Sequence, residues 1–178
     1  MPYFKRLFLH LHTVDTHRYE VMKNCFACGI PLAGIRHDLS KYSPAEFNVS
    51  VRYFQGTRSP YMYEKEHFGH SEGWLHHKGR NRHHWEYWYD MIDGKWVPLE
   101  MPFDCLVEMV CDRVAACKVY QKEKYTDKSA LEYYNKGKGH YVMHKDTAAL
   151  LELMLKMLAK KGEQYTFRYI RRKILKNV

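Results

Sequence analysis

The segment that follows Pro102 constrains the fold most strongly: it reads FDCLVEMVCDRVAACKVYQ, and its apolar residues recur at helical spacing. This apolar stripe consists of Leu106, Met109, Val110, Val114 and Cys117. Asp112 lies within the same stretch, where a buried carboxylate needs a cation or several hydrogen bonds. The sequence therefore predicts a buried helix whose aspartate binds a metal ion, forms a salt bridge with an arginine or caps a neighbouring helix.

The rest of the chain shows a succession of helix start and stop signals. Ser43-Pro44-Ala45-Glu46 has the pattern of a capping box, and Ser59-Pro60 repeats the start signal. Glycine supplies the stop signals, at Gly29, Gly56, Gly69 and Gly162. The predicted helices cover about residues 13–27, 33–41, 44–55, 60–68, 71–90 with a break at Gly79, 103–121, 127–136 and 146–161.

Strand signals are weak by comparison. Asp93-Gly94 predicts a turn, and residues 95–101 are compatible with a short extended segment. There is no convincing alternation of apolar and polar residues and no internal repeat. The 178 residues therefore predict an all-α fold with a single helical domain over residues 1–159, followed by a basic helix or tail over 160–178.

The net charge of +9 is concentrated in that tail. Glu163 is its single acidic residue, against Lys160, Lys161, Arg168, Arg171, Arg172, Lys173 and Lys176. Such a segment either binds nucleic acid or another anionic surface, or is a solvated helix face. The first 159 residues are nearly balanced in charge, which suits a small anionic substrate.

Two absences bear on localisation. No run of 18 apolar residues occurs, so we expect no membrane-spanning helix, and the N-terminus does not resemble a signal peptide. We therefore expect a cytoplasmic protein with reduced thiols. Of the five cysteines, Cys25 and Cys28 form a CxxC pair, which is a weak signal for structural zinc or redox chemistry.

The twelve histidines carry the strongest functional signal. Adjacent residues on a helix, such as His37 and Asp38, point about 100° apart, so both reach one ion only at a centre between helices. The pairs His76-His77 and His83-His84 are seven residues apart. A break in the helix at Gly79 and Asn81 would bring both pairs towards one site. We expect one member of each pair to lie outside that site. The predicted ligands are His17, His37, Asp38, His77, His83, His84 and Asp112. Imidazole and carboxylate together suit manganese, iron, zinc, nickel or cobalt, as one or two ions.

The order His17, His37-Asp38, Asp112 resembles that of the HD-domain superfamily of metal-dependent phosphohydrolases, which are all-helical. The string HDLSK is similar to the HDIGK of its cyclic-dinucleotide branch. That branch has further histidines, and His77 and His83-His84 of this chain match them in order. The strings HDLSKYSPAEF, WLHHKGRNRHHWEYW and EMVCDRVA also resemble a small uncharacterised family found in bacteria and phages. The resemblance implies an HD-like helical bundle that hydrolyses a nucleotide, cyclic nucleotide or related phosphate ester.

Several other residues are candidates for contacting the substrate or supporting the ligands. Lys41 is placed to neutralise a phosphate, and Arg80, Asn81 and Arg82 to hold its other oxygens. Glu86 and Glu46 are candidate ligands or orienters of the histidines, although Glu46 fits its capping box better. The aromatic residues of this region either stack on a nucleobase or fill the core; they are Trp74, Trp85, Tyr87, Trp88 and Tyr89.

Two other functions remain open at this stage. The first is a nucleic-acid-binding accessory protein that uses its basic tail and holds a structural metal. The second is an HD-like di-iron oxygenase, because the same ligand types serve both chemistries. The sequence leaves the substrate and the oligomeric state open.

Overall fold

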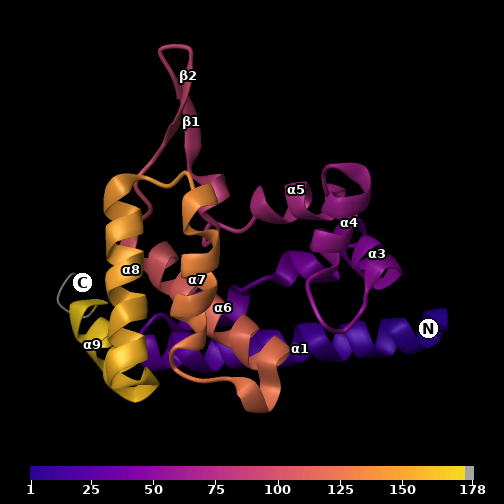
Figure 1. Ribbon diagram of the computed structural model, residues 1–178, viewed down its shortest axis with the longest axis horizontal. Helices are drawn as coiled ribbons and strands as arrows, with labels where there is room; N and C mark the ends of the chain where they lie inside the picture. The colour runs from indigo at the N-terminus through magenta and orange to yellow at the C-terminus, as the bar shows by residue number, and fades with distance from the viewer. Residues whose placement is uncertain (175–178) are drawn as a thin grey trace.

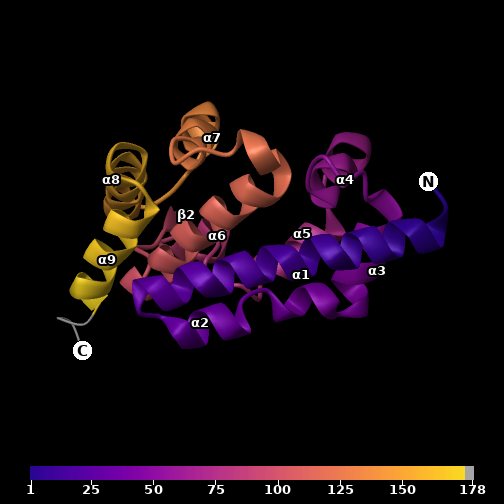
Figure 2. The ribbon, with the colours of Figure 1, turned by 90° about the horizontal axis from the view of Figure 1, so that it is seen from below.

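The longest helix, α1 (Tyr3–Cys28), organises the molecule. The computed structural model of the protein describes residues 1–174, and α1 runs along most of its length (Figure 2). Its buried residues recur every three or four positions, as in an amphipathic helix; they include His10, Val14, His17, Val21 and Cys25. The helix ends at Gly29, which adopts a left-handed φ of 87°. It begins ten residues earlier than predicted, because nothing between Tyr3 and Thr13 interrupts helical hydrogen bonding.

The other helices follow the predicted punctuation closely. They are α2 (Pro31–Arg36), α3 (Pro44–Tyr53), α4 (Pro60–Phe68), α5 (Glu72–Lys78), α6 (Phe103–Gln121), α7 (Ser129–Gly137), α8 (Lys145–Lys161) and α9 (Glu163–Ile174). The starts at Pro44 and Pro60 and the stops at Gly69 and Gly162 are confirmed. Short 3-10 helices cover Leu39–Tyr42, Trp85–Tyr87, Lys122–Lys124 and Lys138–His140.

Two segments differ from the expected helices. The predicted helix over 33–41 divides into α2 and a 3-10 turn, because Asp38 between them adopts a left-handed φ of 53°. Residues 89–98 form an antiparallel hairpin of β1 (Tyr89–Ile92) and β2 (Lys95–Pro98), so the helical expectation for 89–90 is wrong. Its turn is the predicted Asp93-Gly94, and both residues have positive φ, as a tight hairpin turn requires. The hairpin projects from the helices (Figure 1).

One hydrophobic core joins α1, α6, α8 and α9. Val110 and Val114 of α6 are fully buried against Leu151 and Leu155 of α8. Phe167 and Ile170 of α9 belong to the same core, so the first part of the basic tail is folded with the rest of the chain. The all-α, single-domain prediction is confirmed for the described residues.

The boundary predicted at residue 160 falls inside α8, whereas Lys176 lies outside the described residues. Over residues 1–174, none of the helices combines the length and the apolar character needed to cross a membrane.

Candidate metal centre

Asp38 stands at the middle of the histidine cluster. Only 1% of this residue is exposed, and it connects α2 to the following 3-10 turn in a left-handed conformation that aspartate tolerates better than most residues. Its two carboxylate oxygens face different groups of ligand atoms. Oδ1 is 3.4 Å from Nε2 of His77 and 3.4 Å from Nε2 of His83, whereas Oδ2 is 3.2 Å from Nε2 of His37. One carboxylate therefore separates two potential ion sites.

The first group joins α1, Asp38 and α6. Nε2 of His17 lies 3.0 Å from Oδ1 of Asp112 and 3.8 Å from Oδ2 of Asp38. Nε2 of His37 lies 3.4 Å from Nε2 of His17 and 3.8 Å from Oδ1 of Asp112. The partners of Asp112 are thus histidines, which excludes the salt bridge to arginine that the sequence left open.

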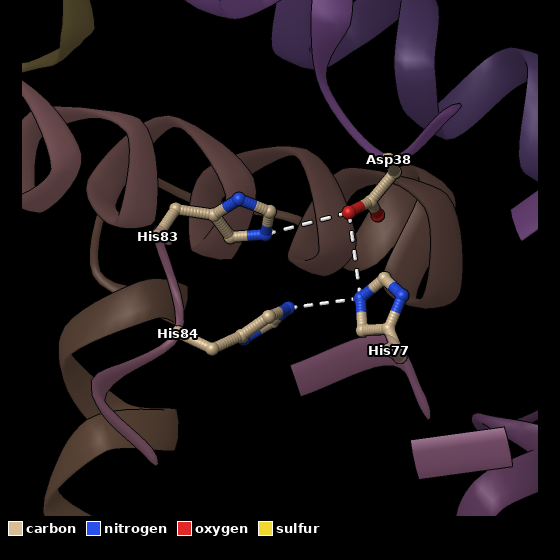
Figure 3. A group of neighbouring side chains, drawn as sticks. All are labelled: Asp38, His77, His83 and His84. Atoms are coloured by element: carbon tan, nitrogen blue, oxygen red, sulfur yellow. Dashed lines mark hydrogen bonds and ion pairs between the residues drawn. The ribbon is translucent and has the colours of Figure 1, made fainter. Parts of the chain in front are cut away.

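The second group joins Asp38 to the segment after α5. His77, His83 and His84 come from both sides of the break at Gly79, and their rings converge on Asp38 (Figure 3). Nε2 of His84 lies 2.9 Å from Nε2 of His77. Within the described residues, Oδ1 of Asp38 and Nε2 of His83 are buried without a hydrogen-bond partner. Unsatisfied buried acceptors that face one another are costly, and a cation between them removes the cost.

The break after α5 is stabilised by Asn81. The amide nitrogen of this residue donates 2.8 Å hydrogen bonds to Oγ of Ser40 and to the carbonyl oxygen of His77. Asn81 therefore positions the histidine segment through its amide nitrogen, and its predicted role as a phosphate ligand stays a prediction. The expectation that one member of each histidine pair lies outside the site holds for His76. It fails for the second pair, because His83 and His84 both point inward.

Two carboxylates fix the orientation of the histidine rings from behind. Glu46 is fully buried, and its Oε2 accepts from Nδ1 of His77 at 2.8 Å while its Oε1 accepts from Nδ1 of His76 at 2.6 Å. The capping-box reading of Glu46 is wrong, because Ser43 makes no side-chain cap and the glutamate points to the histidines. Glu46 instead contacts and orients His76 and His77, which is the alternative position that the sequence offered.

The second of these carboxylates, Glu108, was missed by sequence reasoning. Its Oε1 is 2.8 Å from Nδ1 of His37 and 3.1 Å from Nδ1 of His83. The available signal was its position one helical turn before Asp112, which places both carboxylates on one face of α6. Because Nδ1–H of each ring donates to a carboxylate, Nε2 is left as a lone-pair donor to a metal.

The electrostatics of the cluster favour ionised carboxylates. Burial on its own would raise the pKa of Asp38 and of Asp112, but neighbouring histidines, and for Asp38 also Lys41, hold both well below their usual range. Burial would likewise lower the pKa of His37, yet Asp38 and Glu108 outweigh it and raise that pKa to about 10. A metal ion held by these ionised carboxylates would compete with the histidine protons, so its binding would release protons.

A cavity of about 560 Å³ opens beside the centre. Its wall includes His17, Asp38, His77, His84 and Asp112. Lys41 also faces it, with Nζ 2.6 Å from Oδ2 of Asp38. Burial would lower the pKa of Lys41, but the Asp38 carboxylate outweighs it and raises that pKa, so the ammonium stays charged. The predicted role of Lys41 beside a phosphate is compatible with this position and stays a prediction.

The remaining predicted contacts separate into those that face the cavity and those that do not. Arg80 is exposed and lies outside the cavity wall, with its guanidinium on the carbonyl of His76, so it does not approach the centre. Glu86 lines the cavity, and burial raises its pKa, but it makes no side-chain hydrogen bond to a histidine within the described residues. The cations missed by the sequence reading are Arg58, Lys65 and Arg113, all in the cavity wall.

Aromatic rings complete the cavity wall. Trp74 and Trp85 are among them, as two of the sequence candidates, whereas Tyr87, Trp88 and Tyr89 lie elsewhere. The ammonium of Lys65 lies 4.7 Å from the ring centroid of Trp74, and the guanidinium of Arg113 lies 5.3 Å from that of Tyr141. The cavity therefore combines cations with flat apolar surfaces.

The CxxC pair belongs to the core instead of a metal site. Cys25 and Cys28 are fully buried, and Sγ of Cys28 lies 3.7 Å from Sγ of Cys111. Burial raises the pKa of Cys111 well above its usual value, so this thiol stays protonated and is a poor metal ligand. Among residues 1–174, the groups with metal-ligand geometry contain no cysteine.

The donor set defines the kind of ion that the cluster suits. Histidine side chains from α1, the Asp38 turn and the segment after α5, together with Asp38 itself and Glu108 of α6, form groups that could hold a metal ion. Imidazole nitrogen favours transition metals, whereas calcium and magnesium prefer sites made of oxygen alone.

Comparisons with known proteins assign the chain to a family. No curated protein and no solved structure matches the chain. One family model matches residues 7–157, a span that contains every predicted metal ligand. The chain therefore belongs to this family, DUF5662, which is described as a family of unknown function.

Proposed function

We propose that the protein is a metal-dependent phosphohydrolase that acts on a nucleotide, cyclic nucleotide or related phosphate ester. One observation carries this proposal: His37, His77 and His83 each have Nδ1 held by a carboxylate, of Glu108 or Glu46, and Nε2 aimed at Asp38. Histidines that bind catalytic metals have this arrangement. Purely structural histidines need only one satisfied partner and do not converge on an unsatisfied carboxylate oxygen.

The two oxygens of Asp38 assign the ligands to two ions. His17, His37 and Asp112 would hold one ion with Oδ2, and His77, His83 and His84 would hold the other with Oδ1. Manganese, iron, zinc, nickel and cobalt all suit these ligands. When bound, such ions supply an activated water at neutral pH and polarise the phosphoryl oxygens of the substrate.

The protein's own residues bind and orient the ester. Lys41, beside Asp38 at the cavity wall, neutralises one phosphate oxygen. Glu108 contacts a histidine of each group, so it keeps the two ion sites in a fixed relative position. The aromatic part of the cavity receives the organic group of the ester and keeps water away from it.

The order of the ligands along the chain supports this class of enzyme. It runs His17, His37-Asp38, His77, His83-His84, Asp112, which is the order implied by the resemblance to the HD-domain superfamily. We therefore place the protein beside these enzymes as part of the proposal.

The proposal is tested by turnover. Protein loaded with each of the five metals is assayed for phosphate release from nucleoside monophosphates and phenyl phosphate, and for opening of cyclic nucleotides to nucleoside monophosphates. We expect turnover that Asp38→Asn and Asp112→Asn abolish, while the exposed Asp104→Asn on the same helix as Asp112 retains it. Circular dichroism checks that the helices persist. Turnover unchanged in Asp38→Asn excludes the proposal.

A di-iron oxygenase uses the same ligand types, and it makes a different prediction. Such an enzyme requires about two irons per chain and turnover that stops when dioxygen is removed. Phosphate release that proceeds without dioxygen and with a redox-inert metal such as zinc favours the hydrolase.

A second candidate function rests on α9. Arg168, Arg171, Arg172 and Lys173 are exposed on this helix together with Tyr165 and Tyr169. Cations interleaved with aromatic rings suit a nucleic acid, because the charges bind phosphates and the rings stack on bases. Deletion of the tail is a poor test, because Phe167 and Ile170 are part of the core. Alanine at the four cationic positions should instead weaken nucleic-acid binding and reduce its salt dependence; no change excludes this function.

A further inference from the structure

His10 is a buried histidine that the proposed metal centre does not use. It lies on α1 seven residues before His17, which is about two helical turns, so both side chains are on one face of the helix. Only 5% of His10 is exposed, yet neither of its ring nitrogens has a hydrogen-bond partner within the described residues. Burying two unsatisfied polar atoms is unfavourable, whereas an apolar residue would fill the same space without that penalty.

The cavity connects His10 to the metal centre. His10, Thr13, Val14 and His17 all lie in its wall, so one face of α1 forms a continuous side of the cavity. Seven residues correspond to a rise of about 10 Å along the helix axis. A molecule whose phosphate lies at the centre therefore extends along α1 and reaches His10 with its opposite end.

The surroundings of His10 fix its ring. Phe47 and Phe54 lie on it at centroid distances of 5.3 and 5.4 Å. Ser50 of α3 and Tyr61 of α4 also line the cavity. The position of the imidazole is thus set by apolar packing, and both of its nitrogens are enclosed without a partner among the described residues.

His10 is neutral at physiological pH. Burial, together with the positive charge of Lys41, lowers the pKa of His10 to about 4. A neutral imidazole offers one donor and one acceptor and does not attract a second phosphate. Its complement is an uncharged group that has both an acceptor and a donor.

We propose that His10 determines specificity by forming hydrogen bonds with the uncharged heterocycle of a nucleoside whose phosphate lies at the metal centre. A nucleobase carries ring nitrogens, carbonyl oxygens and amino groups at the end opposite its 5′-phosphate, whereas a sugar phosphate has no flat ring. The aromatic residues of the wall, including Tyr61, Trp74 and Trp85, suit a flat heterocycle. This inference rests on the proposed function, because it places the phosphate at the centre.

Binding of free nucleosides tests His10 separately from hydrolysis. Calorimetry with metal-loaded protein measures the affinity of adenosine, guanosine, cytidine and uridine for the wild type and for His10→Phe, which retains the aromatic packing. We expect at least one nucleoside to bind the wild type and to bind His10→Phe about tenfold more weakly, the scale of a hydrogen bond in a desolvated site. His10→Gln should recover part of the affinity, because it restores a donor and an acceptor.

The control is His12→Phe, on the exposed side of the same helix, which should bind as the wild type does. Equal affinity of the wild type and His10→Phe, or no binding of any of the four nucleosides to the wild type, overturns the inference. Hydrolysis of phenyl phosphate, which has no polar group to reach His10, tests the proposed function independently. Nucleoside binding that depends on His10 without any hydrolysis would leave the subsite in place and exclude the phosphohydrolase.

Discussion

The carboxylate of Glu46 accepts a 2.8 Å hydrogen bond from Nδ1 of His77, which leaves Nε2 of the same ring 3.4 Å from Asp38. Burial would raise the pKa of Glu46, but its hydrogen bonds to the histidines lower that pKa to about 2. The glutamate is therefore ionised at neutral pH and holds His77 in the tautomer that presents a lone pair to the centre.

Replacing Glu46 with glutamine should weaken metal binding at one of the two proposed sites. His76 and His77 donate to different oxygens of Glu46, and glutamine replaces one of these oxygens with an NH2 group that cannot accept. We expect a loss of roughly 10–100-fold in the affinity of the ion held by His77, measured by competition with a chelator. The exposed Glu72→Gln on α5 is the matched control, and an equal affinity in both variants contradicts this role of Glu46.

Glu108 should have the wider effect, because it contacts one histidine from each group. Glu108→Gln removes the charge that orients both His37 and His83. We expect reduced affinity at both sites, with a metal content below that of Glu46→Gln after the same dialysis. Glu123→Gln, which changes an exposed residue beyond the end of α6, provides the comparison. A loss confined to one ion would show that Glu108 does not connect the two sites.

His10 should make stability depend on pH. Its pKa is lowered from 6.5 to about 4 by burial and Lys41, so the unfolded chain takes up this proton more readily than the folded protein. Above about pH 6.5 neither state binds this proton, so His10 does not reduce the free energy of unfolding. As the pH falls towards about 4, protonation of the unfolded chain reduces that free energy progressively. Between about pH 7.5 and pH 5, the wild type should lose about 2 kcal/mol that His10→Phe does not lose. Urea unfolding of both proteins measures the difference, and parallel losses disagree with it.

The basic helix α9 should be part of the cooperative fold. Ile170 is 1% exposed within the main core, and its truncation to alanine should reduce the free energy of unfolding by about 2–4 kcal/mol. Truncation of the neighbouring Tyr169, which is 39% exposed, should cost about 0.5 kcal/mol or less. Equal, small effects at the two positions would mean that α9 is not packed as described.

The features that depend on local chemistry could be predicted from the sequence. Proline and glycine set the ends of α3, α4 and α8, because each acts through its own backbone. The break near Gly79 was visible for the same reason, and it brings His77 and His83 to a common site. Each predicted metal ligand is a histidine or aspartate in an unusual position, and the structure places the other six in one cluster with Asp38.

The features that depend on tertiary contacts could not be predicted. Glu46 matched a capping box, but the buried histidines behind α3 are stronger partners than the exposed helix end. Arg80 lies close to the ligands in sequence, yet the turn directs it to the surface. Arg113 shows the opposite, since only the packing of α6 brings it to the cavity. His10 gave no local signal, because a histidine with unsatisfied nitrogens differs from a satisfied one only in its surroundings.

Metal content tests the central claim most directly. The untagged 178-residue chain, purified without chelator, is analysed by inductively coupled plasma mass spectrometry beside Asp38→Asn and the control Asp104→Asn. Because Asp38 faces both ligand groups, we predict about two transition-metal ions per chain in the wild type and control, and a loss of both in Asp38→Asn. A wild-type protein that contains no metal and takes up none on reconstitution would contradict the account.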